Sequence, residues 1–145
     1  MTKAEYDALP SGPVPSNAER LLQAARDARD QAQRFYSPQC MSGADTADAP
    51  RYDLQADAFG CIASGKDVVA VLALCRAKWT AYCTENNAKV AAAPKISRGP
   101  SAGHSVIGHR HTSVGAWDSV EIFVRTMVAI SPAKARNAKR SPKRA

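Results

Sequence analysis

The apolar residues between positions 17 and 36 recur at alternating steps of four and three. That period places them on one face of an α-helix, and charged residues fill the other sides. Ser16 followed by Glu19 is a capping-box signature for the start of a helix, and Pro38 cannot continue one. The pattern predicts a helix over about 17–36. Its apolar face comprises Leu21, Ala25, Ala28, Ala32 and Phe35.

Two further helices are predicted in direct succession, over about 51–63 and 68–86. Pro50 suits the first turn of a helix, and Asp67 is a favourable N-cap for the later one. The turn around Gly65 is so short that the two helices should pack as an antiparallel hairpin. The inward positions are Leu54, Ala58, Cys61 or Ile62, Val68, Leu72, Cys75, Trp79 and Tyr82.

Two segments flanking this predicted helical domain, which covers residues 16–88, have no helical period. Residues 1–15 are rich in Pro, Gly and Ser and predict an extended arm. Residues 89–111 are interrupted by Pro and Gly and predict an irregular linker. Within the domain, residues 37–50 predict a loop. The predicted fold class is therefore mainly α.

The apolar pattern of residues 112–131 fits two structures. Val114, Trp117, Val120, Val124 and Met127 share a helical face, whereas Val120, Ile122, Val124, Val128 and Ile130 alternate as in a strand. We predict a helix and keep the strand as the alternative. Pro132 should end this element, and residues 132–145 should be disordered unless bound. No stretch is apolar enough to predict a membrane span.

The net charge of +7 is concentrated at the C-terminus. Six basic residues lie among the last twelve residues, and the remainder of the chain has 14 basic and 13 acidic side chains. A nearly neutral body with a basic tail favours one anchoring contact with RNA, DNA, anionic lipid or an acidic protein. The six are Lys134, Arg136, Lys139, Arg140, Lys143 and Arg144.

The apolar content of 45% includes many alanines, so the core should be thin. Alanine buries little surface, and burial stabilises by only about 25 cal/mol per Å². Stability should therefore depend on a partner surface or on covalent cross-links. We expect other protein subunits as partners.

Four cysteines, an even number, are typical of a disulfide framework in an oxidising compartment. The helix lengths place Cys61 near Cys75 across the predicted hairpin. Cys83, eight residues after Cys75 and on broadly the same face, could meet Cys40 in the loop before the hairpin, so we expect the pairs Cys61–Cys75 and Cys40–Cys83. The alternative is that these cysteines are buried, reduced core residues.

The segments Asp57-Ala-Phe-Gly-Cys61 and Cys75-Arg-Ala-Lys-Trp-Thr-Ala-Tyr-Cys83, thirteen residues apart, resemble the coiled-coil-helix-coiled-coil-helix family of mitochondrial proteins. Arg51 stands where the family has its outermost cysteine. The resemblance implies a disulfide-stapled hairpin in the mitochondrial intermembrane space. It also implies a structural accessory subunit of an inner-membrane respiratory complex, which is our leading functional expectation.

Residues suited to catalysis or metal binding do not form a recognisable motif. His109 and His111 could share one face of a strand and hold a metal, but no acidic residue or cysteine is near them in the sequence. We therefore expect no metal, no cofactor and no enzymatic activity. The alternative function is a ribosomal or ribonucleoprotein subunit that contacts RNA through residues 134–145.

Overall fold

The computed structural model describes the backbone of residues 1–36, 43–100, 102–103 and 111–140 and, within these, the side chains outside 43–46 and 131–140. This part of the chain is mainly helical, as predicted, and none of its helices is long and apolar enough to cross a membrane. Its elements are α1 (Lys3–Ala8), α2 (Ala18–Tyr36), α3 (Gly43–Ala63), α4 (Val68–Ala92) and α5 (Ala116–Arg140).

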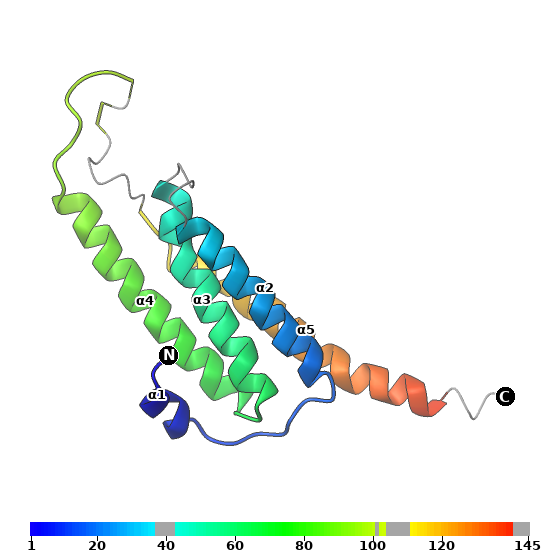
Figure 1. Ribbon diagram of the computed structural model, residues 1–145. Helices are drawn as coiled ribbons and strands as arrows, with labels where there is room; N and C mark the ends of the chain where they lie inside the picture. The colour runs from blue at the N-terminus through cyan, green and yellow to red at the C-terminus, as the bar shows by residue number, and fades with distance from the viewer. Residues whose placement is uncertain (37–42, 101, 104–110, 141–145) are drawn as a thin grey trace.

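Helices α2 and α3 lie side by side and antiparallel (Figure 1). Both bury alanines, and such small side chains let helix backbones approach closely. Two bonds of the Arg29 guanidinium join the helices, to Asp53 at 2.7 Å and to Asp57 at 2.8 Å. The buried alanines are Ala28, Ala32, Ala47, Ala49, Ala56, Ala58 and Ala63.

Helices α3 and α4 form the predicted hairpin, and the segment between α1 and α2 crosses its turn. The Gly12 amide donates to the Gly65 carbonyl at 2.7 Å, and the Asp67 amide donates to the Pro10 carbonyl at 2.9 Å. A Cβ atom on Gly12 would lie 3.0 Å from the Asp67 Cα, and Gly65 has φ +94°, so both positions favour glycine. Asp67 caps α4, as predicted, by accepting from the Ala70 amide at 3.0 Å.

The first fifteen residues contain a helix that the sequence interpretation missed. Thr2 and Glu5 form a capping box at the start of α1: the Thr2 hydroxyl accepts from the Glu5 amide and the Glu5 carboxylate accepts from the Thr2 amide. The prediction of a fully extended arm over 1–15 was therefore wrong. The Thr2-x-x-Glu5 spacing was the signal that could have revealed the helix.

Helices α3 and α4 are both longer than predicted. Helix α3 begins at Gly43 and continues through Pro50, where the sequence predicted a loop. A proline inside a helix costs a backbone hydrogen bond, but the Tyr82 hydroxyl donates to the Ala47 carbonyl at 3.0 Å and ties this turn to α4. Helix α4 continues to Ala92, and Val90 near its end is buried, with only 4% of its surface exposed. The irregular segment therefore begins at residue 93 instead of 89.

Helix α5 confirms the helix that we predicted within residues 112–131, and the alternative strand is not formed. Trp117, Val120 and Val124 bury its inner face against the core. The helix does not end at Pro132 but continues to Arg140. Part of the predicted disordered tail is therefore helical, since Ala, Lys and Arg after the proline favour helix formation.

The start of α5 is fixed by hydrogen bonds from α4 to the chain that returns from the irregular segment. The Asn87 side chain accepts from the Thr112 amide at 2.7 Å and donates to the Thr112 carbonyl at 2.9 Å. The Trp79 indole donates to the Ser113 carbonyl at 3.0 Å. These bonds hold the returning chain against α4.

We predict that Asn87→Ala lowers the free energy of unfolding by about 1–3 kcal/mol, because it leaves the buried amide of Thr112 without its hydrogen bond. Urea unfolding followed by circular dichroism measures the change. Thr84→Ala is the matched control, since Thr84 is exposed and bonds only the Thr80 carbonyl of its own helix. Equal stability of Asn87→Ala and the wild type would contradict the role of Asn87.

Candidate functional site

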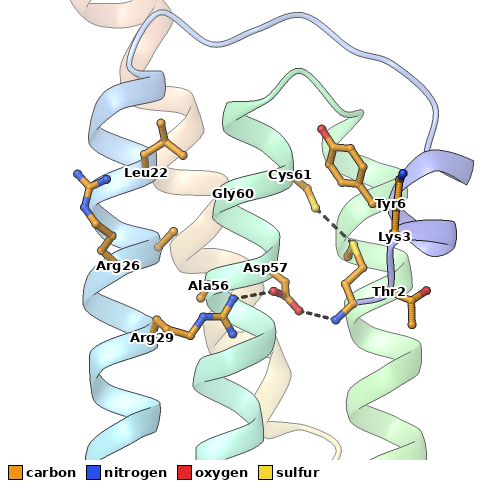
Figure 2. Close-up of a pocket in the computed structure, with 12 residues that line it drawn as sticks. Thr2, Lys3, Tyr6, Leu22, Arg26, Arg29, Ala56, Asp57, Gly60 and Cys61 are labelled. Atoms are coloured by element: carbon orange, nitrogen blue, oxygen red, sulfur yellow. Dashed lines mark hydrogen bonds and ion pairs between the residues drawn. The ribbon is translucent and has the colours of Figure 1, made fainter.

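A groove of about 510 Å³ lies among α1, α2 and α3. We call it the α1–α3 groove, because α1 and α2 form its walls and α3 forms its floor (Figure 2). Figure 2 shows Leu22 and Arg26 on the α2 side and Lys3 and Tyr6 on the α1 side. The lining residues are Met1, Thr2, Lys3, Tyr6, Leu22, Ala25, Arg26, Arg29, Ala56, Asp57, Gly60 and Cys61.

Asp57 is the acidic residue of the groove, and its carboxylate bonds two cations, one of which, Arg29, it shares with Asp53. One carboxylate oxygen accepts from the N-terminal ammonium of Met1 at 2.9 Å, and the other accepts from Arg29 at 2.8 Å. The Arg26 guanidinium bonds the side-chain oxygen of Gln23, and Lys3 has no ion pair among the described residues. Neither Lys3 nor Arg26 therefore has an acidic partner in the part of the chain that the structure describes.

The groove residues were not predicted as a site. Lys3, Arg26 and Gly60 are far apart in the sequence and belong to three different helices. No local spacing or motif connects them, so only the packing of the helices could have revealed the groove.

The predicted disulfide between Cys61 and Cys75 is not present in the structure. All three described cysteines are free thiols and are buried. The Cys75 thiol lies 3.7 Å from the Leu54 carbonyl, whereas the Cys61 thiol points to the Met1 sulfur at 3.4 Å. Leu54 precedes Cys61 by seven residues, which is about 10 Å along a helix. The sequence estimate had therefore placed Cys75 against the wrong turn of α3.

The second predicted pair lies partly outside the described residues, because Cys40 is not among them. Its predicted partner Cys83 is a fully buried free thiol. The described thiols thus occupy core positions, which was the alternative interpretation of the cysteines.

Burial raises the pKa of the Cys75 thiol to about 12, and the negative charges of Asp57 and Cys61 act in the same direction. Burial also raises the pKa of Cys61. A thiol is nucleophilic only as its thiolate, so these environments suppress reactivity at neutral pH. The arrangement favours a structural role for Cys75.

The histidines proposed as weak metal ligands are not brought together in the described residues. His111 is exposed, and His109 lies outside the described part of the chain. Within the residues that the structure covers, no group of three or more His, Cys, Asp or Glu side chains could hold a metal ion.

The predicted basic segment, residues 134–145, is divided by the end of α5. Lys134, Arg136, Lys139 and Arg140 belong to the helix, while Lys143 and Arg144 lie outside the described residues. In Figure 1, the last turns of α5 extend beyond the ends of α2 and α3. The helical part of the basic segment therefore projects from the body.

The acidic residues of α5 lie near its start and are paired. Arg76 of α4 bonds Asp118 and Glu121, each at 2.8 Å, and Arg125 bonds Glu121 at 3.2 Å. The hydrogen bond from Arg76 lowers the pKa of Glu121. These ion pairs join α5 to α4 and neutralise the acidic groups nearest to the basic segment.

No protein-family model, curated protein or solved structure matches this chain.

We predict that alkylation of the native protein with iodoacetamide at pH 8 leaves Cys75 unmodified. With a pKa of about 12, only about one thiol in ten thousand is a thiolate at that pH, and the side chain is buried. After unfolding in guanidinium, Cys75 should react fully. Peptide mass spectrometry without reduction measures both states, and rapid native labelling of Cys75 would contradict the prediction.

Proposed function

We propose that this protein is a non-catalytic subunit of a nucleic-acid-containing assembly, which it contacts through its basic C-terminal segment. The observation that carries the proposal is the continuation of α5 from a well-packed start into a projecting basic end. Of the two functions expected from the sequence, we therefore favour the subunit that contacts nucleic acid over the respiratory-chain subunit.

The distribution of charge supports a phosphate-binding role for this end of the protein. Residues 1–85 contain 9 basic and 11 acidic side chains, whereas residues 86–145 contain 11 basic and 2 acidic ones. Both of those acids, Asp118 and Glu121, are paired with Arg76. No acidic residue follows Glu121 in the sequence. Residues 122–145 therefore contain no Asp or Glu side chain that would repel a bound phosphate.

The backbone of α5 continues through the basic positions 134–140. Positions 136, 139 and 140 are three and four residues apart, which is the spacing of one helical face. A helix of 25 residues is about 37 Å long, so the basic end stands well away from the anchoring contact of Trp117. The Asn17 side chain donates to the Met127 carbonyl at 2.9 Å and fixes α5 further along its length.

The composition of the basic segment favours a polyphosphate over a membrane. A helix that lies in a lipid surface buries large apolar residues such as Trp, Phe or Leu. The apolar residues after Ile130 are only Ala and Pro. Binding would then depend on charge and on the release of counterions from nucleic-acid phosphates.

The leading expectation from the sequence, an accessory subunit of a mitochondrial respiratory complex, stays a prediction. It depended on a hairpin stapled by cysteines, and the described cysteines are free thiols. No described contact favours that function over the nucleic-acid contact.

We predict that changing Arg136, Lys139 and Arg140 together to Gln reduces the salt dependence of RNA binding. Losing three phosphate contacts should flatten the slope of log K against log salt by about 2 for single-stranded RNA and lower affinity more than tenfold at low salt. Fluorescence anisotropy with labelled single-stranded RNA and duplex DNA, over a salt series, measures both quantities and distinguishes the two nucleic acids.

The matched control changes Arg20, Arg34 and Lys89 to Gln, which alters the net charge equally at exposed positions of α2 and α4. This control should keep at least half of the wild-type affinity. An equal loss in both triple variants would refute a localised contact. Binding to anionic vesicles without binding to RNA or DNA would replace the proposal with a membrane contact.

A further inference from the structure

We propose that the nucleic acid bound by α5 is single-stranded and that one of its bases stacks on the exposed ring of Phe123. This contact rests on the proposed function and adds to it the kind of nucleic acid and a residue that touches a base. Phosphates alone distinguish single strands from duplexes poorly, because both carry them. An unpaired base, in contrast, offers an aromatic face that stacks on a protein side chain.

Helix α5 has two large apolar side chains on its surface before its basic end. Ile122 is 66% exposed and Phe123 is 46% exposed, whereas Trp117, Val120 and Val124 bury the inner face of the same helix. Nearly half of the Phe123 surface is therefore available to a ligand. A base stacked on the ring would remove apolar surface from water, which is favourable.

The packing of Phe123 against the core leaves its ring accessible. The ring centroids of Phe123 and the buried Phe59 are 5.7 Å apart and their planes meet at 89°, which is an edge-to-face pair. In such a pair Phe59 covers at most one face of the Phe123 ring. Packing against Phe59 also restrains the ring, which lowers the entropy cost of stacking on it.

The register of α5 places Phe123 in line with the basic end of the helix. Position 134 comes eleven residues later, which is about three helical turns, so the two positions lie on one side of the helix about 16 Å apart. A strand whose phosphates contact the basic positions can therefore continue along α5 to Phe123. No Asp or Glu in residues 122–145 would repel it along this path.

A duplex has no free base face to place on Phe123. Its bases are stacked on one another, and extruding one of them costs free energy. Duplex binding would therefore use the basic positions alone, whereas a single strand would use both the basic positions and the ring.

The test compares three labelled probes of equal length by fluorescence anisotropy at low salt. They are single-stranded oligodeoxyadenylate, the same sugar–phosphate chain with an abasic spacer at every position, and a DNA duplex. The abasic chain keeps the phosphates and lacks the bases, so it measures the phosphate contact alone. We expect the wild type to bind oligodeoxyadenylate about tenfold more tightly than the abasic chain, through stacking of one base. Equal affinity for these two chains would refute the stacking contact.

Two variants of Phe123 locate the contact. Phe123→Leu keeps an apolar side chain without a ring, so it should lower the affinity for oligodeoxyadenylate about tenfold and leave the abasic chain and the duplex within about twofold. Phe123→Trp keeps a ring and should retain at least half of the wild-type affinity. Its indole fluorescence should be quenched by oligodeoxyadenylate and not by the abasic chain, because Trp79 and Trp117 are 0% exposed and cannot stack on a base.

Tyr36→Leu is the matched control. Tyr36 is 49% exposed, but it ends α2 at the opposite end from Asn17, which contacts α5. This change should leave all three affinities unaltered. Circular dichroism checks that each variant is folded, and the quenching of Phe123→Trp decides the outcome if Phe123→Leu fails to fold. Absence of quenching on binding, or an unchanged preference for bases in folded Phe123→Leu, would overturn the contact.

Failure of the stacking contact is distinguishable from failure of the proposed function. Salt-dependent binding of the abasic chain and the duplex, with no added affinity for bases, would overturn the stacking contact and leave the phosphate contact intact. Binding of none of the three probes would overturn both. The triple change of Arg136, Lys139 and Arg140 to Gln should weaken all three probes, whereas Phe123→Leu should weaken only the single strand that carries bases.

Discussion

The hydrogen bonds of Asn87 and Trp79 to residues 112 and 113 decide where the C-terminal third of the protein lies. Between Ala92 and Ala116 the chain has no helix within its described residues, and such a long connection by itself fixes neither position nor direction. Because α4 binds the returning backbone at one place, α5 begins there, buries Trp117 and brings Asp118 and Glu121 to Arg76. Together these contacts set the direction in which the basic end of α5 extends.

Polar contacts also compensate for a core that relies heavily on alanine. Trp79, Phe59 and Trp117 are the largest fully buried side chains, but α2 and α3 bury mostly small ones, each contributing little hydrophobic free energy. Arg29 joins those two helices, and Lys78 of α4 pairs with Glu5 of α1 at 2.8 Å. The exposed ion pairs contribute little individually, but they fix which helix faces which.

The α1–α3 groove and the end of α5 occupy different parts of the molecule and differ in chemistry. The α1–α3 groove has apolar residues, Leu22, Ala25 and Ala56, beside the ion-paired carboxylate of Asp57. The end of α5 has a row of bases and no large apolar residue, which suits an extended polyphosphate.

Local patterns in the sequence determined the mainly helical class, the helix over 18–36, the Asp67 cap and the concentration of charge at the C-terminus, because each depends on neighbouring residues. Tertiary structure decided the rest. Helix α3 continues through Pro50 and is tied to α4 by the bond from Tyr82 to Ala47, the hairpin register separated Cys61 from Cys75, and packing brought Lys3, Arg26 and Gly60 to one groove. The periodicity of apolar residues shows which face of a helix is apolar. Which other helix packs against that face, and in which register, depends on how helices that are distant in the sequence pack together.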